Sequence, residues 1–137
     1  MTPTSVHCRV VLSAYDVSTN LDVYKTTSKT GVVYDENSQY YNQIMEQSEV
    51  PSDVKFDRIG QELTDGTTYA TIYIEHNGNG FSSDNVRPGY GSAIGLRGKN
   101  GSLSPTYGDV DISANDMKDL LSKLDADKNP VIEIKTK

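Results

Sequence analysis

The chain has 137 residues, a formal net charge of −6 at pH 7, 35% hydrophobic residues and 23% charged residues. A chain of this length can bury a core without disulfides, and its single cysteine excludes an intrachain disulfide in any case. The acidic balance excludes broad binding to a phosphate backbone, which requires clustered lysine and arginine, and it permits a basic partner. Because no linker-like stretch divides the sequence, we predict one domain over residues 1–137.

The amino-terminal residues do not show the basic and then apolar pattern of a signal peptide. No apolar run approaches the ~20 residues that a bilayer-spanning helix needs. We therefore expect a soluble, cytoplasmic protein with no membrane partner.

The first third of the chain predicts strands and one helix. Apolar residues alternate with polar ones over residues 6–17, which indicates a half-buried strand with Cys8 as a small buried hydrophobe. After a polar turn, residues 21–27 are expected to return as the second strand of an antiparallel hairpin. A short strand is predicted at residues 32–34, and a helix of about three turns at residues 37–47.

The middle of the chain is less uniform. Residues 54–59 fit either a strand or the start of a helix, and we favour a strand because Gly60 follows it. Alternation over residues 67–75 predicts a strong strand. Two shorter strands are expected at residues 93–96 and 110–112.

The best-marked element is a helix that begins after Ser113. Ser113 can cap it, and Asp116 lies near the positive end of the helix dipole. A closing strand is predicted at residues 131–135. Four apolar residues recur at helical spacing: Met117, Leu120, Leu121 and Leu124. The sequence therefore predicts an α+β fold, with a mainly antiparallel sheet and two helices, the clearer one near the C-terminus.

Asp125, Asp127 and Asn129 match the first half of the calcium loop of an EF-hand. That loop needs glycine at its sixth position and glutamate at its twelfth, but Pro130 and Thr136 occupy these positions. We therefore predict a polar turn between the last helix and the last strand, and no metal site.

Glycines recur over residues 76–98 in a spacing that is similar to the glycine boxes of histidine-kinase-type ATP-binding domains. In that family an aspartate opens the first box and recognises adenine. His76 occupies this position here, and no helix with a magnesium-binding asparagine directly precedes the box. We therefore predict no ATP site and no cofactor.

Residues 85–108 contain three cations and no Asp or Glu, a local charge of +3 that leaves −9 on the rest of the chain. Glycine lets the backbone approach a ligand closely, arginine offers a planar fork for carboxylate or phosphate, and tyrosine can stack on a ring. The predicted ligand- or partner-binding residues are Arg87, Tyr90, Arg97, Lys99 and Tyr107. The alternative is that the segment forms glycine-rich hairpins with ordinary solubilising charges.

The sequence contains no complete catalytic motif, which favours a non-enzymatic protein without deciding the matter. We expect a binding protein that engages a protein partner or associates with itself, in the style of an accessory, inhibitor or particle protein of a virus or mobile element. The alternative is a small-molecule binder or enzyme for an anionic, nucleotide-like ligand held by residues 78–108. Nucleic acid is not expected as a partner. The sequence identifies neither the partner nor the oligomeric state nor the source organism.

Overall fold

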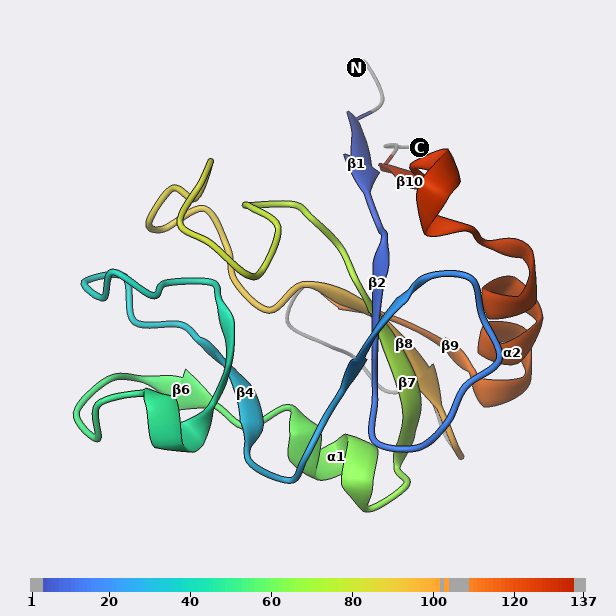
Figure 1. Ribbon diagram of the computed structural model, residues 1–137, viewed down its shortest axis with the longest axis horizontal. Helices are drawn as coiled ribbons and strands as arrows, with labels where there is room; N and C mark the ends of the chain where they lie inside the picture. Colours follow the sequence, from blue (N-terminus) through green and yellow to red (C-terminus); the bar gives the residue numbers. More distant parts are fainter. Residues whose placement is uncertain (1–3, 102, 104–108, 135–137) are drawn as a thin grey trace.

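The computed structural model describes residues 4–101, 103 and 109–134 (Figure 1). The fold is α+β, with mostly antiparallel strand pairs and the clearer helix near the C-terminus, which confirms the predicted class.

A five-stranded sheet forms the centre of the molecule, in the order β3-β2-β7-β8-β9. The central strand β7 is antiparallel to both of its neighbours, β2 and β8, whereas the edge strands β3 and β9 run parallel to theirs. The strands are β2 (Val10–Ser13), β3 (Asp22–Lys25), β7 (Thr68–Tyr73), β8 (Gly95–Lys99) and β9 (Val110–Ser113).

Two smaller sheets flank the central one. A three-stranded sheet has the order β5-β4-β6, with the 3-10 helix η1 (Gln47–Glu49) directly after β5. Its strands are β4 (Thr30–Val33), β5 (Ile44–Glu46) and β6 (Phe56–Asp57). An antiparallel ribbon joins β1 (Thr4–His7) to β10 (Val131–Ile134), which brings the two ends of the described chain together (Figure 1).

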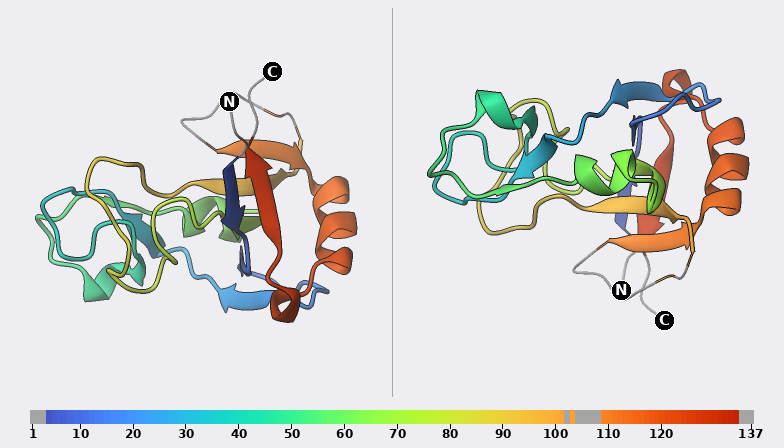
Figure 2. Two further views of the ribbon diagram at one scale, coloured as in Figure 1. Left: turned by 90° about the horizontal axis from the view of Figure 1, so that it is seen from above. Right: turned by 90° about the horizontal axis from the view of Figure 1, so that it is seen from below.

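The central sheet is covered on both faces (Figure 2). On one face, Ala70 and Ile72 of β7 pack with Met117 of α2 (Ala114–Lys123). On the other face, Tyr73 of β7 packs with Leu63 of α1 (Gly60–Thr64) and with the three-stranded sheet. Successive side chains of β7 therefore enter two different cores, one on each face of the sheet, instead of alternating between a core and solvent.

The long strand predicted at residues 6–17 is interrupted between β1 and β2. Cys8 is buried, as predicted, and its N–H donates to the carbonyl of Pro130 at 3.1 Å. Arg9, the next residue, turns its side chain to Glu75. Cys8 thus bonds to the chain just before β10 and Arg9 to the chain just after β7. The two strands accordingly part, β1 pairing with β10 in the ribbon and β2 with β7 in the central sheet.

The predicted antiparallel hairpin is wrong, because β3 runs parallel to β2. The intervening residues travel back past the end of α2 instead of reversing at once. Thr19 Oγ1 donates to the carbonyl of Leu121 at 2.9 Å, and the carbonyl of Asn20 accepts from the N–H of Ala126 at 3.0 Å. These long-range bonds hold the connection in a crossover, which no local turn signal encodes.

The helix predicted at residues 37–47 is also wrong. Asp35 starts a tight turn, Asn42 adopts a left-handed conformation with φ 58°, and the chain continues into β5. A left-handed residue interrupts an α-helix, and strand pairing with β4 buries Ile44 in the second core. The first helix is instead α1, which follows the two-residue strand β6.

The predicted cap, final helix and closing strand are confirmed over the described residues, the strand as Val131–Ile134. Ser113 Oγ accepts from the N–H of Asp116 at 3.1 Å and caps α2. The segment that partly matches a calcium loop forms a polar turn around the 3-10 helix η2 (Ala126–Lys128), in which Asp125 accepts from the N–H of Asp127. Upstream, β8 starts two residues later than predicted, since Ala93 is left-handed with φ 56°.

Candidate functional site

The structure places Arg97 and Lys99 on β8 in an ion-pair cluster. Arg97 donates two hydrogen bonds to Asp111, from Nε to Oδ1 at 2.8 Å and from Nη2 to Oδ2 at 3.0 Å. Glu62 lies 3.3 Å from both Arg97 Nη1 and Lys99 Nζ, and Asp109 lies 3.8 Å from Arg97 Nε. The side chains of Arg97 and Lys99 are only 16% and 12% exposed. Acidic residues from other elements therefore neutralise two of the three local cations.

Arg87 and Tyr90 lie elsewhere, in the loop between β7 and β8. Tyr90 is 64% exposed, and the guanidinium of Arg87 stands over its ring at 5.8 Å from the centroid. Tyr107 lies outside the described residues. The structure thus does not gather the predicted binding residues into one described surface, and ligand binding by them stays a prediction.

The loop that carries Arg87 and Tyr90 is held from inside by Asn77, which is 5% exposed. Its Nδ2 donates to the carbonyls of Arg87 at 2.9 Å and Gly91 at 3.0 Å, and its Oδ1 accepts from the N–H of Arg87 at 2.8 Å. His76 Nε2 lies 2.8 Å from the carbonyl of Tyr90 and donates to it. The backbone is therefore fixed at both residues that the loop displays.

Glycine flanks the displayed tyrosine for a conformational reason. Gly89 and Gly91 have φ +84° and +107°, a region that residues with a Cβ rarely adopt. A second buried amide, Asn42, accepts from the N–H of Ala93 at 3.0 Å and donates to the carbonyl of Asn77. Side-chain amides thus hold the backbone of residues 77–93 in a loop that precedes the strand β8.

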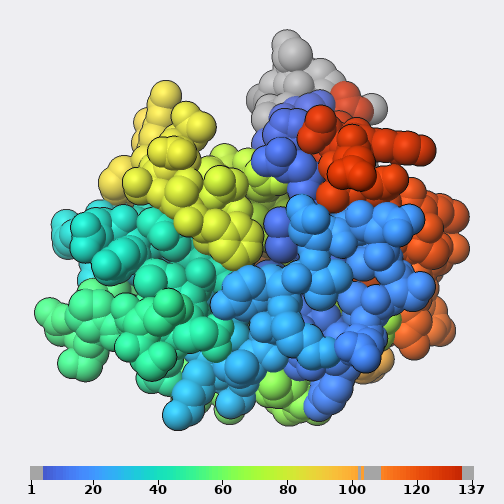
Figure 3. All heavy atoms as spheres, in the orientation of Figure 1, coloured from blue at the N-terminus to red at the C-terminus, as the bar shows by residue number. Residues whose placement is uncertain are grey.

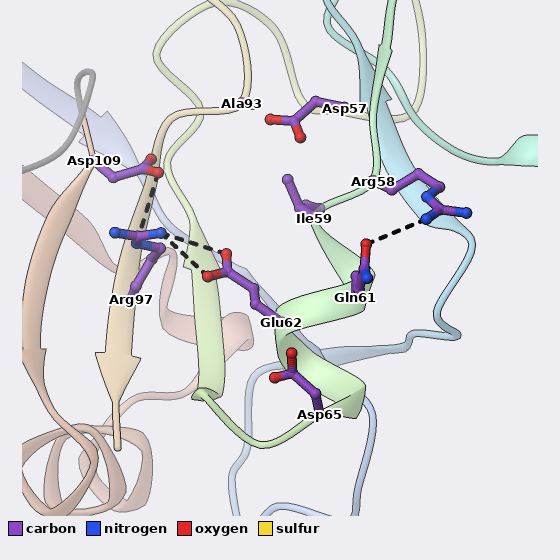
Figure 4. Close-up of a pocket in the computed structure, with 9 residues that line it drawn as sticks. All are labelled: Asp57, Arg58, Ile59, Gln61, Glu62, Asp65, Ala93, Arg97 and Asp109. Atoms are coloured by element: carbon purple, nitrogen blue, oxygen red, sulfur yellow. Dashed lines mark hydrogen bonds and ion pairs between the residues drawn. The ribbon is translucent and has the colours of Figure 1, made fainter. Parts of the chain in front are cut away.

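The second candidate site is an open pocket of about 400 Å³ between α1, the β6–α1 junction and β8 (Figure 4). We call it the acidic pocket. It is lined by Asp57, Arg58, Ile59, Gln61, Glu62, Asp65, Ala93, Arg97 and Asp109. Four carboxylates and two guanidiniums give it a formal charge of −2. Because Arg97 is already paired and Arg58 turns toward Gln61, the carboxylates dominate the open space (Figure 4).

Two carboxyls of this pocket hold protons more tightly than usual. Partial removal of its carboxyl group from water, and then the charge of Glu62, raise the pKa of Asp57, although the residue as a whole is exposed. Burial is also the main cause of the raised pKa of Asp109, and it outweighs the N–H of Gly95 and the charge of Arg97, which lower it. Ionising these carboxyls is therefore less favourable than in water, and a cation in the pocket would stabilise their charged forms.

A narrower extension shares five lining residues with the acidic pocket and reaches Tyr73 in the second core. Tyr73 is 2% exposed, and burial raises its pKa to about 12. The amide of Asn42, which also donates to Asn77 and accepts from Ala93, lies near enough to lower the pKa of Tyr73 in part. In the described part of the chain, the Tyr73 hydroxyl makes no hydrogen bond with good geometry.

Sequence reasoning did not find the acidic pocket, because its acids come from distant segments. The parallel pairing of β8 and β9, which sets Arg97 beside Asp111, and the packing of α1 bring them together. One signal was present, since Asp109 directly precedes β9 and Asp111 lies two residues later within it, a spacing that places both side chains on one side of an extended chain.

No three His, Cys, Asp or Glu side chains within residues 4–101 and 109–134 are arranged to hold a metal ion. Among the same residues, no helix is long and apolar enough to cross a membrane. Comparison with protein-family models, with curated proteins and with solved structures finds no match to this chain.

Proposed function

We propose that this protein is a non-enzymatic binding protein that engages a protein partner through the loop at residues 78–93, with Tyr90 and Arg87 as its main contacts. The supporting observation is an exposed tyrosine, stacked under an arginine, on a backbone that a buried asparagine fixes. In the space-filling view this part of the chain, coloured yellow, projects from the body of the molecule (Figure 3).

Tyrosine and arginine are the residue types that most often dominate the energy of protein interfaces. A loop that is already ordered loses little conformational entropy when a partner binds, so more of its contact energy appears as affinity. The hydrogen bonds of Asn77 and His76 supply that order here.

Arg87 is the arginine best suited to a partner. Arg9 and Arg97 are paired with carboxylates, and Arg58 bonds to glutamine side chains. Within the described residues, the guanidinium of Arg87 contacts only the Tyr90 ring, and its donors remain available. A partner that brings a carboxylate or carbonyl to Tyr90 would meet these donors.

The test compares Tyr90→Ala and Arg87→Ala with Tyr15→Ala, which removes a similarly exposed tyrosine, 61% exposed, next to α1. Light scattering over a concentration series measures self-association, and quantitative affinity capture measures a foreign partner. We expect each loop variant to weaken the detected interaction about tenfold or more, as interface anchors do, and Tyr15→Ala to preserve it. Equal behaviour of all three variants would refute the loop as the binding surface.

A further inference from the structure

The acidic pocket has properties that the Tyr90 loop does not explain. The carboxylate of Asp57 points into it (Figure 4), and in the described part of the chain this carboxylate makes no hydrogen bond or ion pair. Every other carboxylate in the lining has at least one partner: Glu62 and Asp109 meet Arg97, and Asp65 accepts from Thr67. The pocket thus presents one acceptor with both oxygens available.

A second observation is independent of the acids. The Tyr73 hydroxyl in the narrow extension is almost completely buried and lacks a hydrogen-bond partner in the part of the chain that the structure describes. A buried polar group without a partner destabilises the fold, so a polar group that entered from the pocket and bonded to it would reduce that cost. Negative charge in the acidic pocket and an unsatisfied hydroxyl on a residue that lines the narrow extension both indicate a polar occupant.

We propose that the acidic pocket binds an organic cation, a guanidinium or alkylammonium group, with Asp57 as its principal carboxylate partner. The formal charge of −2 selects a cation over an anion. Ile59 and Ala93 provide apolar wall for a short alkyl stem. A guanidinium fits better than an ammonium, because its planar fork matches a free carboxylate and it is less strongly hydrated.

This assignment reverses the sign of the ligand in the alternative that the sequence left open, an anionic small molecule. The cations that suggested an anion site, Arg97 and Lys99, are held by Glu62 and Asp111, and these acids would repel an anion. The inference is independent of the proposed loop surface, so either can fail alone.

The test titrates the full chain with 1-butylguanidinium, butylammonium and neutral 1-butanol, and follows backbone amide shifts by NMR at pH 7. We expect saturable binding of both cations, tighter for the guanidinium, with shifts centred on α1 and β8, and no saturable binding of butanol. Asp57→Asn should weaken the cation affinity about tenfold, the loss typical of one charge-assisted hydrogen bond. Asp53→Asn, the same change at an exposed position outside the pocket, should preserve it.

The pH dependence of cation binding provides a second test. Lowering the pH should weaken cation binding, since Asp57 and Asp109 take up protons sooner than ordinary carboxyls. The other charged groups that face the pocket are Arg58, Glu62, Asp65 and Arg97. Binding that strengthens as the pH falls would contradict the assignment.

Two capped peptides distinguish the possible sources of the cation. One carries a single arginine as its only charged residue, and the other has citrulline, which is uncharged, at the same position. Tighter binding of the arginine peptide than of butylguanidinium indicates a protein side chain, and binding of the small cation alone indicates a free metabolite; both support the site. No saturable binding of either small cation, equal binding of butanol, or an Asp57→Asn affinity equal to that of Asp53→Asn would overturn it.

Discussion

Replacing Arg97 by methionine should destabilise the protein strongly, because Arg97 compensates three acids, Glu62, Asp109 and Asp111. The side chain is 16% exposed, and that of its main partner Asp111 is 4% exposed. Removing one member of a buried ion pair leaves an uncompensated charge and costs about 3–5 kcal/mol. We expect about 3 kcal/mol, the lower end of that range, since Lys99 still faces Glu62 and the pocket opens to water.

Urea denaturation at pH 7 gives the free energy of unfolding, and the loss corresponds to a fall in melting temperature of roughly 10 °C for a chain of this size. Arg58→Met is the matched control, because Arg58 is exposed and its side chain bonds, within the described residues, only to Gln47 and Gln61. Its effect should stay within about 0.5 kcal/mol. The double variant Arg97→Met/Asp111→Leu should recover part of the loss, since it removes both charges.

The pH dependence follows from the raised pKa of Asp109. A carboxyl with a raised folded-state pKa binds its proton more tightly when folded, so stability falls as the pH rises through that pKa. Without Arg97 the pKa rises further, and the deficit of the variant should shrink as the pH is lowered from 7 toward about 4. The reasoning would be refuted if Arg97→Met lost no more unfolding free energy than Arg58→Met. It would also be refuted if the loss in Arg97→Met grew on acidification.

Three further predictions concern the framework around the two sites. Asn77→Ala should leave buried backbone groups unsatisfied, cost about 2–3 kcal/mol, and speed amide hydrogen exchange in residues 78–93 more than elsewhere; unchanged exchange would contradict its role. Ser113→Ala should cost about 1 kcal/mol in urea denaturation, whereas Ser113→Asp should cost little, because aspartate also caps helices. Gly98→Ala should cost about 1–3 kcal/mol, since the new Cβ would lie 2.5 Å from Met117 Cβ; a neutral effect would show that α2 can shift away from β8.

Local sequence was sufficient wherever neighbouring residues decide the structure. The period-two pattern of β7, the cap at Ser113 and the helical spacing of α2 all act within one element, and the structure confirms them. The same holds for Cys8, whose burial follows from its place in an alternating stretch.

Tertiary structure decided what depends on distant partners. The parallel direction of β3 rests on contacts between Thr19 and α2, and the loss of the expected helix at residues 37–47 rests on strand pairing and on the buried amide of Asn42. The candidate sites divide in the same way. The chemistry of Arg87 and Tyr90 could be read from their residue types, but the charge of the acidic pocket could not, because opposite charges far apart in sequence cancel or accumulate only once the chain has folded.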